Sequence, residues 1–377
     1  MSTDLVKATY LATRPDRDPE VLAENIAREQ SLELTRSLIP DSVADRLLGH
    51  ILSVSERDTQ HWELEIGYPA ELVSGQVGQL LHLLYGNISY YPHIRLVDLE
   101  LPDTLLASLA GPIAGIPGIR AWTGVEERAL LMTVLKPRGS DPADLARLAG
   151  RFAGAGGDIV KDDQNLVESD LDTFRNRISL CAQAIERAAD KTGRKALYLP
   201  HVAGSGRHLN RQLDHVARLG LGGVVMCPWV MGLETAAAAA AEHGLMWLAH
   251  PAVAGVFTES NTRGIAMPVL LGKLVRIAGA DISIFPGSGG RISSHHLHDE
   301  AATCKALTAA LGALRPSLPC TGGGKTLEQA PQTAHRYGPN CAVLVGGDLI
   351  GRGPELEAAV RETIARMFST DGDVSPA

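Results

Sequence analysis

The sequence predicts a small α+β domain over residues 1–128, followed by a closed (β/α)₈ barrel over residues 129–377. Two observations point to the barrel. From about residue 129 onward, short apolar runs alternate with segments of helical period. Polar side chains also gather where each apolar run ends. Because barrel active sites are built at the C-terminal ends of the strands, the second observation predicts where the functional site lies.

The barrel strands are predicted from runs rich in Val, Ile and Leu that are almost continuously apolar. Such runs are typical of parallel strands covered on both faces. The eight runs are residues 129–137, 156–163, 195–202, 220–229, 245–252, 280–287, 318–324 and 341–348. Eight strand-then-helix units favour a closed barrel. An open doubly wound sheet is the alternative, although no GxGxxG sequence follows the first strand.

Helices are predicted after the strands from apolar residues at helical spacing. The clearest segments are residues 141–156, 170–193, 267–280 and 354–368. Several open with a Ser or Asp that can cap the first turn, and several end on Gly. These caps indicate that strand and helix alternate in a regular order.

The first 128 residues have a different pattern. An alternating run over 61–72 and a second run over 90–102 predict strands, and residues 74–87 between them predict a helix. This mixture indicates a small α+β domain of the ferredoxin-like kind. The Gly- and Pro-rich segment 108–122 is the predicted link to the barrel.

The composition narrows the class of protein. A net charge of −8 and a pI near 5.9 disfavour nucleic acid as a main partner. The five cysteines form no CxxC pair, so neither a disulfide scaffold nor a thiolate zinc site is predicted. The N-terminus lacks the apolar stretch of a secretory signal, and no run of 18 apolar residues predicts a membrane span. We therefore expect a cytoplasmic enzyme without a membrane partner.

The strongest local signal is GGDIVKDDQNL, residues 156–166. Lys161 ends a predicted strand and is followed by two carboxylates and an amide, Asp162, Asp163 and Gln164, which brings one cation and two anions together. A salt-bridged surface turn would also explain the pattern. The position at a barrel strand end favours oxygen ligands for Mg²⁺ instead. Since an ammonium would be repelled by that cation, the Lys161 side chain must be neutral, displaced or converted to an anion.

Two further cations follow the first barrel strand, in the segment VLKPRG. Lys136 and Arg138 suit an anionic substrate or an enolate oxygen. An electropositive, partly dry site would lower the pKa of the lysine and suit it to proton transfer. A solvated basic turn is the alternative interpretation. His250 ends the fifth strand, where a lone histidine is more often a core residue than a catalyst.

Two glycine clusters, CTGGGKT at 320–326 and VGGD at 345–348, follow the seventh and eighth strands. Glycines there let backbone N–H groups approach a phosphate at a helix N-terminus, in the loops where barrels commonly hold one. Tight turns alone would explain either cluster. TGGGKT lacks the GxxxxGK[ST] spacing, so a nucleoside triphosphate is not predicted.

Together these segments resemble the large chain of ribulose-bisphosphate carboxylase/oxygenase (RuBisCO), and more closely its relatives, the RuBisCO-like proteins. The resemblance covers nearly the whole chain. Its most telling stretches are YGNISYYPHIRLVDLELP, LAGPIAGIPGIR, TVLKPRGS, GGDIVKDDQN, AHPAVAG and VLVGGD. In that family the lysine of strand two is carbamylated by CO₂ and binds Mg²⁺ with an Asp and a Glu.

The resemblance implies that Lys161 is the carbamylated ligand and Asp163 the second ligand. Gln164 stands at the third position, where the family has a glutamate. Gln can donate its carbonyl oxygen, but the ligand charge falls from three negatives to two. This predicts weaker Mg²⁺ binding and a more Lewis-acidic ion.

The resemblance implies roles for other barrel residues. Lys136 matches the family's proton-transferring lysine, Arg138 a second lysine, and His250 an active-site histidine. Arg291 falls near the mobile-loop lysine that carboxylases use to hold CO₂. The glycines that match the backbone cradle for the first phosphate are Gly323, Gly324, Gly346 and Gly347.

In the N-terminal domain, Glu29 and Asn87 match residues that reach into a neighbouring subunit's site. The resemblance therefore implies a homodimer with shared active sites. Pro251 follows His250 where carboxylases have a phosphate-binding arginine, and the strand-six histidine of carboxylases has no counterpart in SIFPGS. These departures exclude a bisphosphate substrate and CO₂ fixation from the expected functions.

The expected function is a Mg²⁺-dependent enzyme that forms an enolate from a keto-sugar monophosphate. It would be an isomerase, an enolase or a decarboxylase of a sugar-acid phosphate. One alternative is the methionine-salvage enolase of 2,3-diketo-5-methylthiopentyl-1-phosphate, although those enolases have a lysine where this chain has Asn87. The other alternative is a catalytically inactive binding or regulatory homologue.

Overall fold

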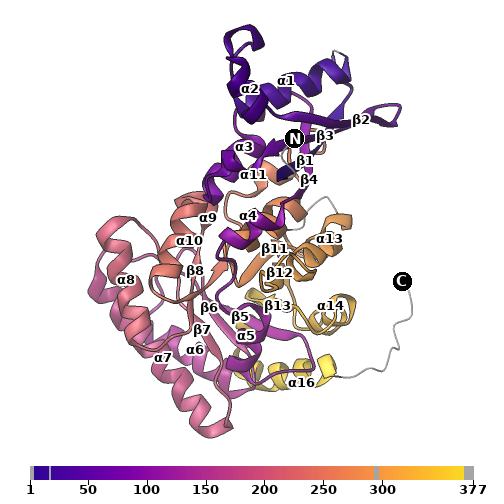
Figure 1. The fold of residues 1–377 in the computed structure, drawn as a ribbon. Coiled ribbons are helices and arrows are strands. Elements are labelled where there is room, and N and C mark those ends of the chain that lie inside the picture. The colour runs from indigo at the N-terminus through magenta and orange to yellow at the C-terminus, as the bar shows by residue number, and fades with distance from the viewer. Residues whose placement is uncertain (1–3, 17, 293–296, 369–377) are drawn as a thin grey trace.

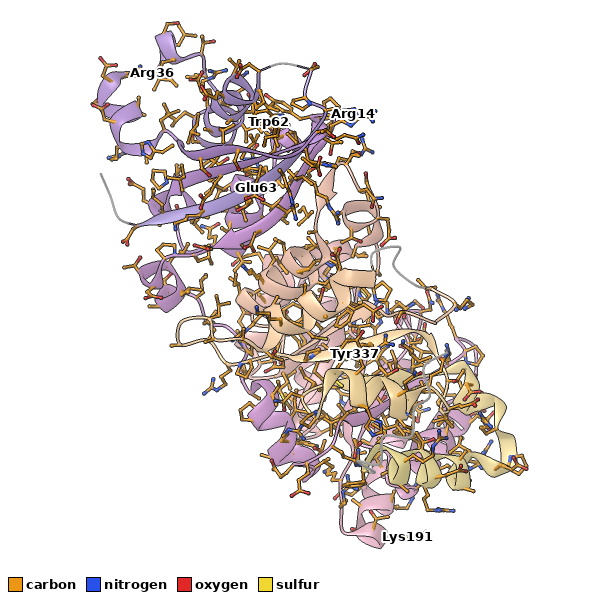
Figure 2. All side chains as sticks on the ribbon, turned by 90° about the vertical axis from the view of Figure 1, so that its right-hand side faces the viewer. Arg14, Arg36, Trp62, Glu63, Lys191 and Tyr337 are labelled. Atoms are coloured by element: carbon orange, nitrogen blue, oxygen red, sulfur yellow. The ribbon has the colours of Figure 1, made fainter. Side chains whose placement is uncertain are left out.

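The computed structural model describes residues 4–16, 18–292 and 297–368, with backbone only for 297–298. It contains two sheets, one of five strands and one of eight. Figure 1 shows the five-stranded sheet and its helices at one end of the molecule and the barrel below them. In Figure 2, Arg36 lies at the N-terminal end of this arrangement and Lys191 at the opposite end.

The N-terminal sheet has the order β10-β4-β1-β3-β2. Strands β1 to β4 pair antiparallel, and their βαββαβ succession is that of a ferredoxin-like domain. The elements are β1 (Leu5–Thr13), α1 (Pro19–Ser31), η1 (Arg36–Leu38), α2 (Asp41–Leu47), β2 (His50–Asp58), β3 (His61–Pro69), η2 (Ala70–Val73), α3 (Val77–Tyr85), η3 (Asn87–Tyr90), β4 (Ile94–Glu100) and α4 (Asp103–Ser108).

The fifth strand of this sheet comes from the barrel chain. Strand β10 (Gly264–Ile265) pairs parallel with β4. The N–H of Gly264 also donates to the Tyr85 hydroxyl at 2.6 Å. A short segment after the fifth barrel strand therefore joins the two sheets, which the sequence pattern did not predict.

All eight barrel strands form where they are predicted, and they pair in parallel in the order β7-β6-β5-β13-β12-β11-β9-β8. A bridge between His201 and Val225 joins the two end strands and closes the barrel. The strands are β5 (Leu130–Leu135), β6 (Ile159–Asp162), β7 (Leu197–Leu199), β8 (Gly223–Met226), β9 (Met246–Ala249), β11 (Ile282–Pro286), β12 (Leu318–Lys325) and β13 (Ala342–Val345).

Helices cover the outside of the barrel (Figure 1). The Asp141 and Asp170 carboxylates cap α6 and α7 by accepting from backbone N–H groups two and three residues ahead. The helices are α6 (Pro142–Gly154), α7 (Leu171–Thr192), α8 (Gly206–Arg218), α9 (Pro228–Met231), α10 (Leu233–Glu242), α11 (Gly255–Thr258), η4 (Pro268–Leu274), α12 (Val275–Ile277), α13 (Leu297–Thr308), α14 (Ala330–Tyr337), α15 (Gly347–Gly351), η5 (Gly353–Glu355) and α16 (Leu356–Phe368). Helix η4 has π-helical turns.

Part of the predicted link, residues 108–122, is helical. Helix α5 (Gly115–Thr123) buries Ile116 and Ile119 in the same apolar cluster as Leu130 and Met132 of β5. Because these strand residues lie near the N-terminal ends of the barrel strands, α5 packs against that end of the barrel interior. No helix of the described ranges is both long and apolar enough to cross a bilayer.

Candidate active site

The alternation of side chains along each barrel strand decides which residues face the barrel interior. On β6 the interior cluster includes Ile159, whereas Val160 packs in the outer core beneath the helices. With a period of two, Lys161 therefore lies on the inward side and Asp162 on the outward side. Every second residue along a strand faces the same side, so the other strands can be followed in the same way from their interior residues. The inward positions at the C-terminal ends include Lys136, Lys161, His201, Cys227, His250 and Gly346.

Lys161 is fully enclosed, with 1% of its surface exposed. Its Nζ donates to the backbone carbonyl of Asp162 at 2.7 Å. Burial lowers the pKa of the Lys161 amine, and the neighbouring carboxylates of Asp163 and Asp162 oppose that shift. A buried amine with a lowered pKa is more easily deprotonated, which is the form that reacts with CO₂.

Asp163 and Gln164 follow Lys161 at the mouth of the barrel and are partly exposed. The Asp163 N–H donates to the Leu135 carbonyl at 3.1 Å, which fixes the start of the loop against β5. One Asp163 carboxylate oxygen accepts from the Asn165 N–H at 2.9 Å.

These residues fit a Mg²⁺ ion only if Lys161 supplies a ligand. Within the described ranges, no three His, Cys, Asp or Glu side chains are grouped so that they could hold a metal ion. Asp163 and Gln164 offer two oxygen donors, whereas Mg²⁺ prefers several oxygen ligands. A carbamate on Lys161 would complete an all-oxygen donor set, and the ligand assignment made from the sequence stays a prediction.

Lys136 lies across Gly346, at the ends of two adjacent strands. A Cβ atom on Gly346 would stand 3.2 Å from Lys136 Nζ and 2.7 Å from a Val134 methyl group. The absence of a side chain at Gly346 leaves room for Val134 and for the end of the Lys136 side chain. The peptide between Lys136 and Pro137 is cis, and Arg138 beyond it is exposed.

His250 is held in its neutral form. Its Nδ1 lies 3.2 Å from the Ala252 N–H and accepts its proton, so the ring carries its own proton on Nε2. Burial lowers the pKa of His250 well below the ordinary value, and the nearby Lys161 and His201 lower it further. The structure thus brings the half-buried His250 and the buried Lys161 into one group at the ends of their strands.

His201 belongs to the same group, although its place at a strand end was the only feature of the sequence that singled it out. Its Nε2 lies 3.9 Å from the Cys227 thiol, and its main-chain N–H donates to the Asp162 carboxylate at 3.0 Å. Burial lowers the pKa of His201 and raises that of Cys227 to about 11. Both residues could have been identified from the sequence, because each lies an even number of positions after an inward-facing residue of its strand.

Gly323 and Gly324 lie beneath a loop that follows β11. The Ile292 N–H donates to the Gly323 carbonyl at 2.6 Å. A Cβ atom on Gly323 would come within 2.0 Å of the Ile292 carbonyl oxygen, and one on Gly324 within 2.8 Å of the Arg291 nitrogen. These glycines therefore allow a close approach of two backbones. The Arg291 side chain is exposed.

Gly347, after β13, has open space where a side chain would stand. Phosphate binding by this glycine and by Gly323, Gly324 and Gly346 stays a prediction, as does the substrate contact assigned to Arg138 and Arg291.

Glu29 and Asn87 meet in the N-terminal domain. The Asn87 amide donates to a Glu29 carboxylate oxygen at 3.0 Å, and the adjacent Gln30 amide bonds the backbone of α3 and η3. Figure 1 shows α1, which carries Glu29, at the far end of the molecule from β5, β6 and β7. The pair is therefore assembled within the N-terminal domain.

The chain is similar to known proteins along its full length. It matches the ribulose bisphosphate carboxylase large chain N-terminal domain over residues 1–105 and the catalytic domain of that chain over residues 115–363. The 5-methylthioribulose-1-phosphate isomerase of Rhodospirillum rubrum is 36% identical, over 99% of this chain and 98% of that protein. The 2,3-diketo-5-methylthiopentyl-1-phosphate enolase of Bacillus velezensis is 34% identical, over 78% of this chain and 76% of that protein.

Among solved structures, the RuBisCO-like protein from Rhodopseudomonas palustris superposes with a TM-score of 0.86 at 31% identity, and all of both chains is covered. Two domain matches, relatives above 30% identity and this structural likeness agree with one another. The chain therefore belongs to the ribulose bisphosphate carboxylase large-chain family, as an enzyme of its RuBisCO-like group.

Proposed function

We propose that this protein is a Mg²⁺-dependent enzyme that forms an enolate from a keto-sugar monophosphate and does not fix CO₂. The observation that carries the proposal is the buried Lys161 with Asp163 and Gln164 at the end of β6, beside Lys136 and His250. Isomerisation of a 5-methylthioribulose-1-phosphate-like ketose is the favoured reaction. The similarity to the named isomerase extends over 99% of this chain, compared with 78% for the named enolase.

The carbamate of Lys161, the Asp163 carboxylate and the Gln164 amide oxygen would hold the cation. When bound, Mg²⁺ would polarise the substrate ketone and so acidify the neighbouring C–H bond. The enclosure of Lys161 excludes water from the base of the site, which strengthens every charge interaction there. Gln164 reduces the ligand charge, so a higher Mg²⁺ concentration is needed to fill the site than with a glutamate.

Proton movement is assigned to two side chains. The Lys136 Nζ, which lies close to Gly346, would take or return a proton at the carbon beside the ketone. The neutral His250 donates from Nε2, because its Nδ1 already accepts the Ala252 N–H. A neutral histidine can donate to the substrate oxygen without placing a further positive charge beside the cation.

The substrate is proposed to carry one phosphate. Gly346 and Gly347 offer backbone N–H groups after β13, with open space above Gly347. The loop after β9 carries Pro251 directly after His250, so that position offers no cation for a second phosphate. An uncharged end, such as a methylthio group, therefore suits this side of the site.

We also propose a homodimer in which the N-terminal domain of one subunit completes the site of the other. Tyr90 adjoins Asn87 in η3 and is 92% exposed, while Val253 and Val256 after β9 are 52% and 80% exposed. These exposed apolar side chains are available for contact with a partner subunit. A two-fold dimer would bring the Glu29–Asn87 pair to the partner's barrel mouth.

The Lys161→Ala variant tests the proposal. We expect the wild-type protein to turn over 5-methylthioribulose-1-phosphate only with Mg²⁺ and bicarbonate, and the variant to lose both turnover and Mg²⁺ dependence. Circular dichroism would establish that the variant is folded. A folded Lys161→Ala protein that keeps wild-type activity would contradict the carbamate assignment.

A further inference from the structure

A buried ionic network lies on the outward side of β6, directly behind Lys161. Asp162 is completely buried. Its carboxylate accepts from Arg177 and from the His201 N–H, the latter at 3.0 Å, and it accepts from the Tyr198 hydroxyl at 3.0 Å. Among the described residues, these partners come from α7, from β7 and from the residue two positions after β7.

Arg177 extends inward from α7 and binds two carboxylates at once. One guanidinium nitrogen pairs with Asp162. The other edge forms a two-point contact with Glu168, from Nε to Oε1 at 2.5 Å and from NH2 to Oε2 at 3.1 Å. The side chain of Arg177 is 3% exposed and that of Glu168 is 14% exposed. A planar guanidinium fork fixes the orientation of a carboxylate as well as its distance.

Asp162 and Glu168 are the two ends of the segment that contains Asp163 and Gln164. Between them the chain forms neither helix nor strand. Its internal hydrogen bonds include two backbone turns, Leu166 N–H to Asp163 and Val167 N–H to Asn165, both at 2.9 Å, beside the bond from the Asn165 N–H to the Asp163 carboxylate. A single guanidinium thus closes the loop from both sides. Loss of either contact would let the ligand oxygens move relative to Lys161.

We infer that Arg177 and Glu168 are positioning residues, which hold Asp163 and Gln164 in the geometry that Mg²⁺ requires. The inference rests on the proposed function, because it concerns the same metal site. Mg²⁺ demands near-octahedral ligand geometry and tolerates distortion poorly. Partners behind the direct ligands commonly change metal affinity by about 10- to 100-fold when they are removed.

The test uses Glu168→Ala, since removal of Arg177 would leave the buried Asp162 carboxylate unpaired and could prevent folding. Glu168 is at the edge of the network, so Asp162 keeps its partner in this variant. Glu186→Ala is the matched control. Glu186 lies on α7, the helix that carries Arg177, and pairs at 2.6 Å with Lys195, which follows that helix; both side chains are well exposed.

The affinity for Mg²⁺ would be measured by calorimetry on the full-length protein at saturating bicarbonate, together with the melting temperature. We expect Glu168→Ala to raise the Kd for Mg²⁺ by about tenfold or more, and Glu186→Ala to leave it unchanged. Arg177→Lys keeps the charge but loses the fork, and it should also weaken Mg²⁺ binding while the protein stays folded.

Two outcomes would overturn the inference and are distinguishable. If the wild-type protein binds Mg²⁺ and Glu168→Ala binds it equally tightly, the positioning role is wrong and the proposed function stands. If the wild-type protein binds no Mg²⁺ at saturating bicarbonate, the proposed function fails and the inference fails with it. A fall in melting temperature without a change in Kd would indicate a purely structural network.

Discussion

Gln164 is the single residue that most changes the electrostatics of the proposed metal site. A carbamate and one carboxylate leave two negative charges around the cation, and the third donor is a neutral amide oxygen. Hard cations bind more tightly as the ligand charge increases. The site is therefore expected to fill at a higher Mg²⁺ concentration than one with three anionic ligands.

The Gln164→Glu variant should tighten Mg²⁺ binding by about tenfold, which corresponds to about 1.4 kcal/mol. Calorimetric titration at fixed bicarbonate measures the change. Asn165→Asp is the control, since it adds the same charge one residue further along, at an exposed position. Equal gains from both variants would contradict a ligand role for residue 164, because bulk charge alone would then explain them.

The buried histidines predict a stability that depends on pH. Burial lowers the pKa of both His201 and His250, so the unfolded chain takes up protons before the folded one as the pH falls. Their contribution to stability is present above the ordinary histidine pKa near 6.5 and is lost as the pH falls below it. Each can contribute a slope of up to about 1.4 kcal/mol per pH unit.

Urea unfolding between pH 7.5 and pH 5.5 checks this expectation. The wild-type free energy of unfolding should decrease toward pH 5.5, and His250→Gln should flatten part of that decrease. His335→Gln, at an exposed position on α14, should leave the slope unchanged. The same slope in all three proteins would mean that His250 is not buried in its neutral form.

At the scale of single elements, the barrel strands were predictable because their apolar runs are nearly continuous. β1 alternates buried and partly exposed residues along LVKATYLAT, so its period of two was available in the sequence. β2 is mostly exposed, and β10 has two residues, so neither has an apolar pattern that could identify it. Pairing with a distant strand, rather than local pattern, determines these two.

Helix α7 carries Arg177 and depends on its N-cap. The Asp170 carboxylate accepts from the Thr173 N–H at 2.7 Å. Asp170→Ala should destabilise the protein by about 1 kcal/mol, as expected for loss of a helix cap. Urea unfolding measures the loss of stability. Asp172→Ala is the comparison, because Asp172 lies two residues further on, in the first turn of α7, and its side chain is well exposed. An unchanged free energy for Asp170→Ala would show that α7 is held by packing alone.

The site as a whole was predictable only in part. Strand ends identified Lys136, Lys161 and His250, because parallel strands bring their C-terminal ends to one face. The loop that ends at residue 292 packs against Gly323. This contact was not predictable, because the two backbone segments are far apart in the sequence. The double pairing of Arg177 depends on the same kind of tertiary contact.

At the scale of the whole molecule, a shared site has a direct consequence for mixed dimers. Lys161→Ala is expected to inactivate the barrel part of a proposed shared site, and Glu29→Gln the N-terminal part. Random mixing of the two should restore about a quarter of wild-type activity, because half of the dimers would hold one intact site. Refolding the two variants together, with each refolded alone as a control, makes the measurement. No recovery in confirmed mixed dimers would mean that each subunit completes its own site.

The most direct test of the central claim is proton NMR in D₂O with Mg²⁺, bicarbonate and 5-methylthioribulose-1-phosphate, extended to other keto-sugar monophosphates and 3-oxo sugar-acid phosphates. The account predicts that a proton beside the ketone exchanges for deuterium, or that a substrate carboxyl is released as CO₂, only when Mg²⁺ and bicarbonate are both present. Lys161→Ala should show neither. If the wild-type protein neither exchanges, isomerises nor decarboxylates any substrate of the panel, enolate formation is not its chemistry.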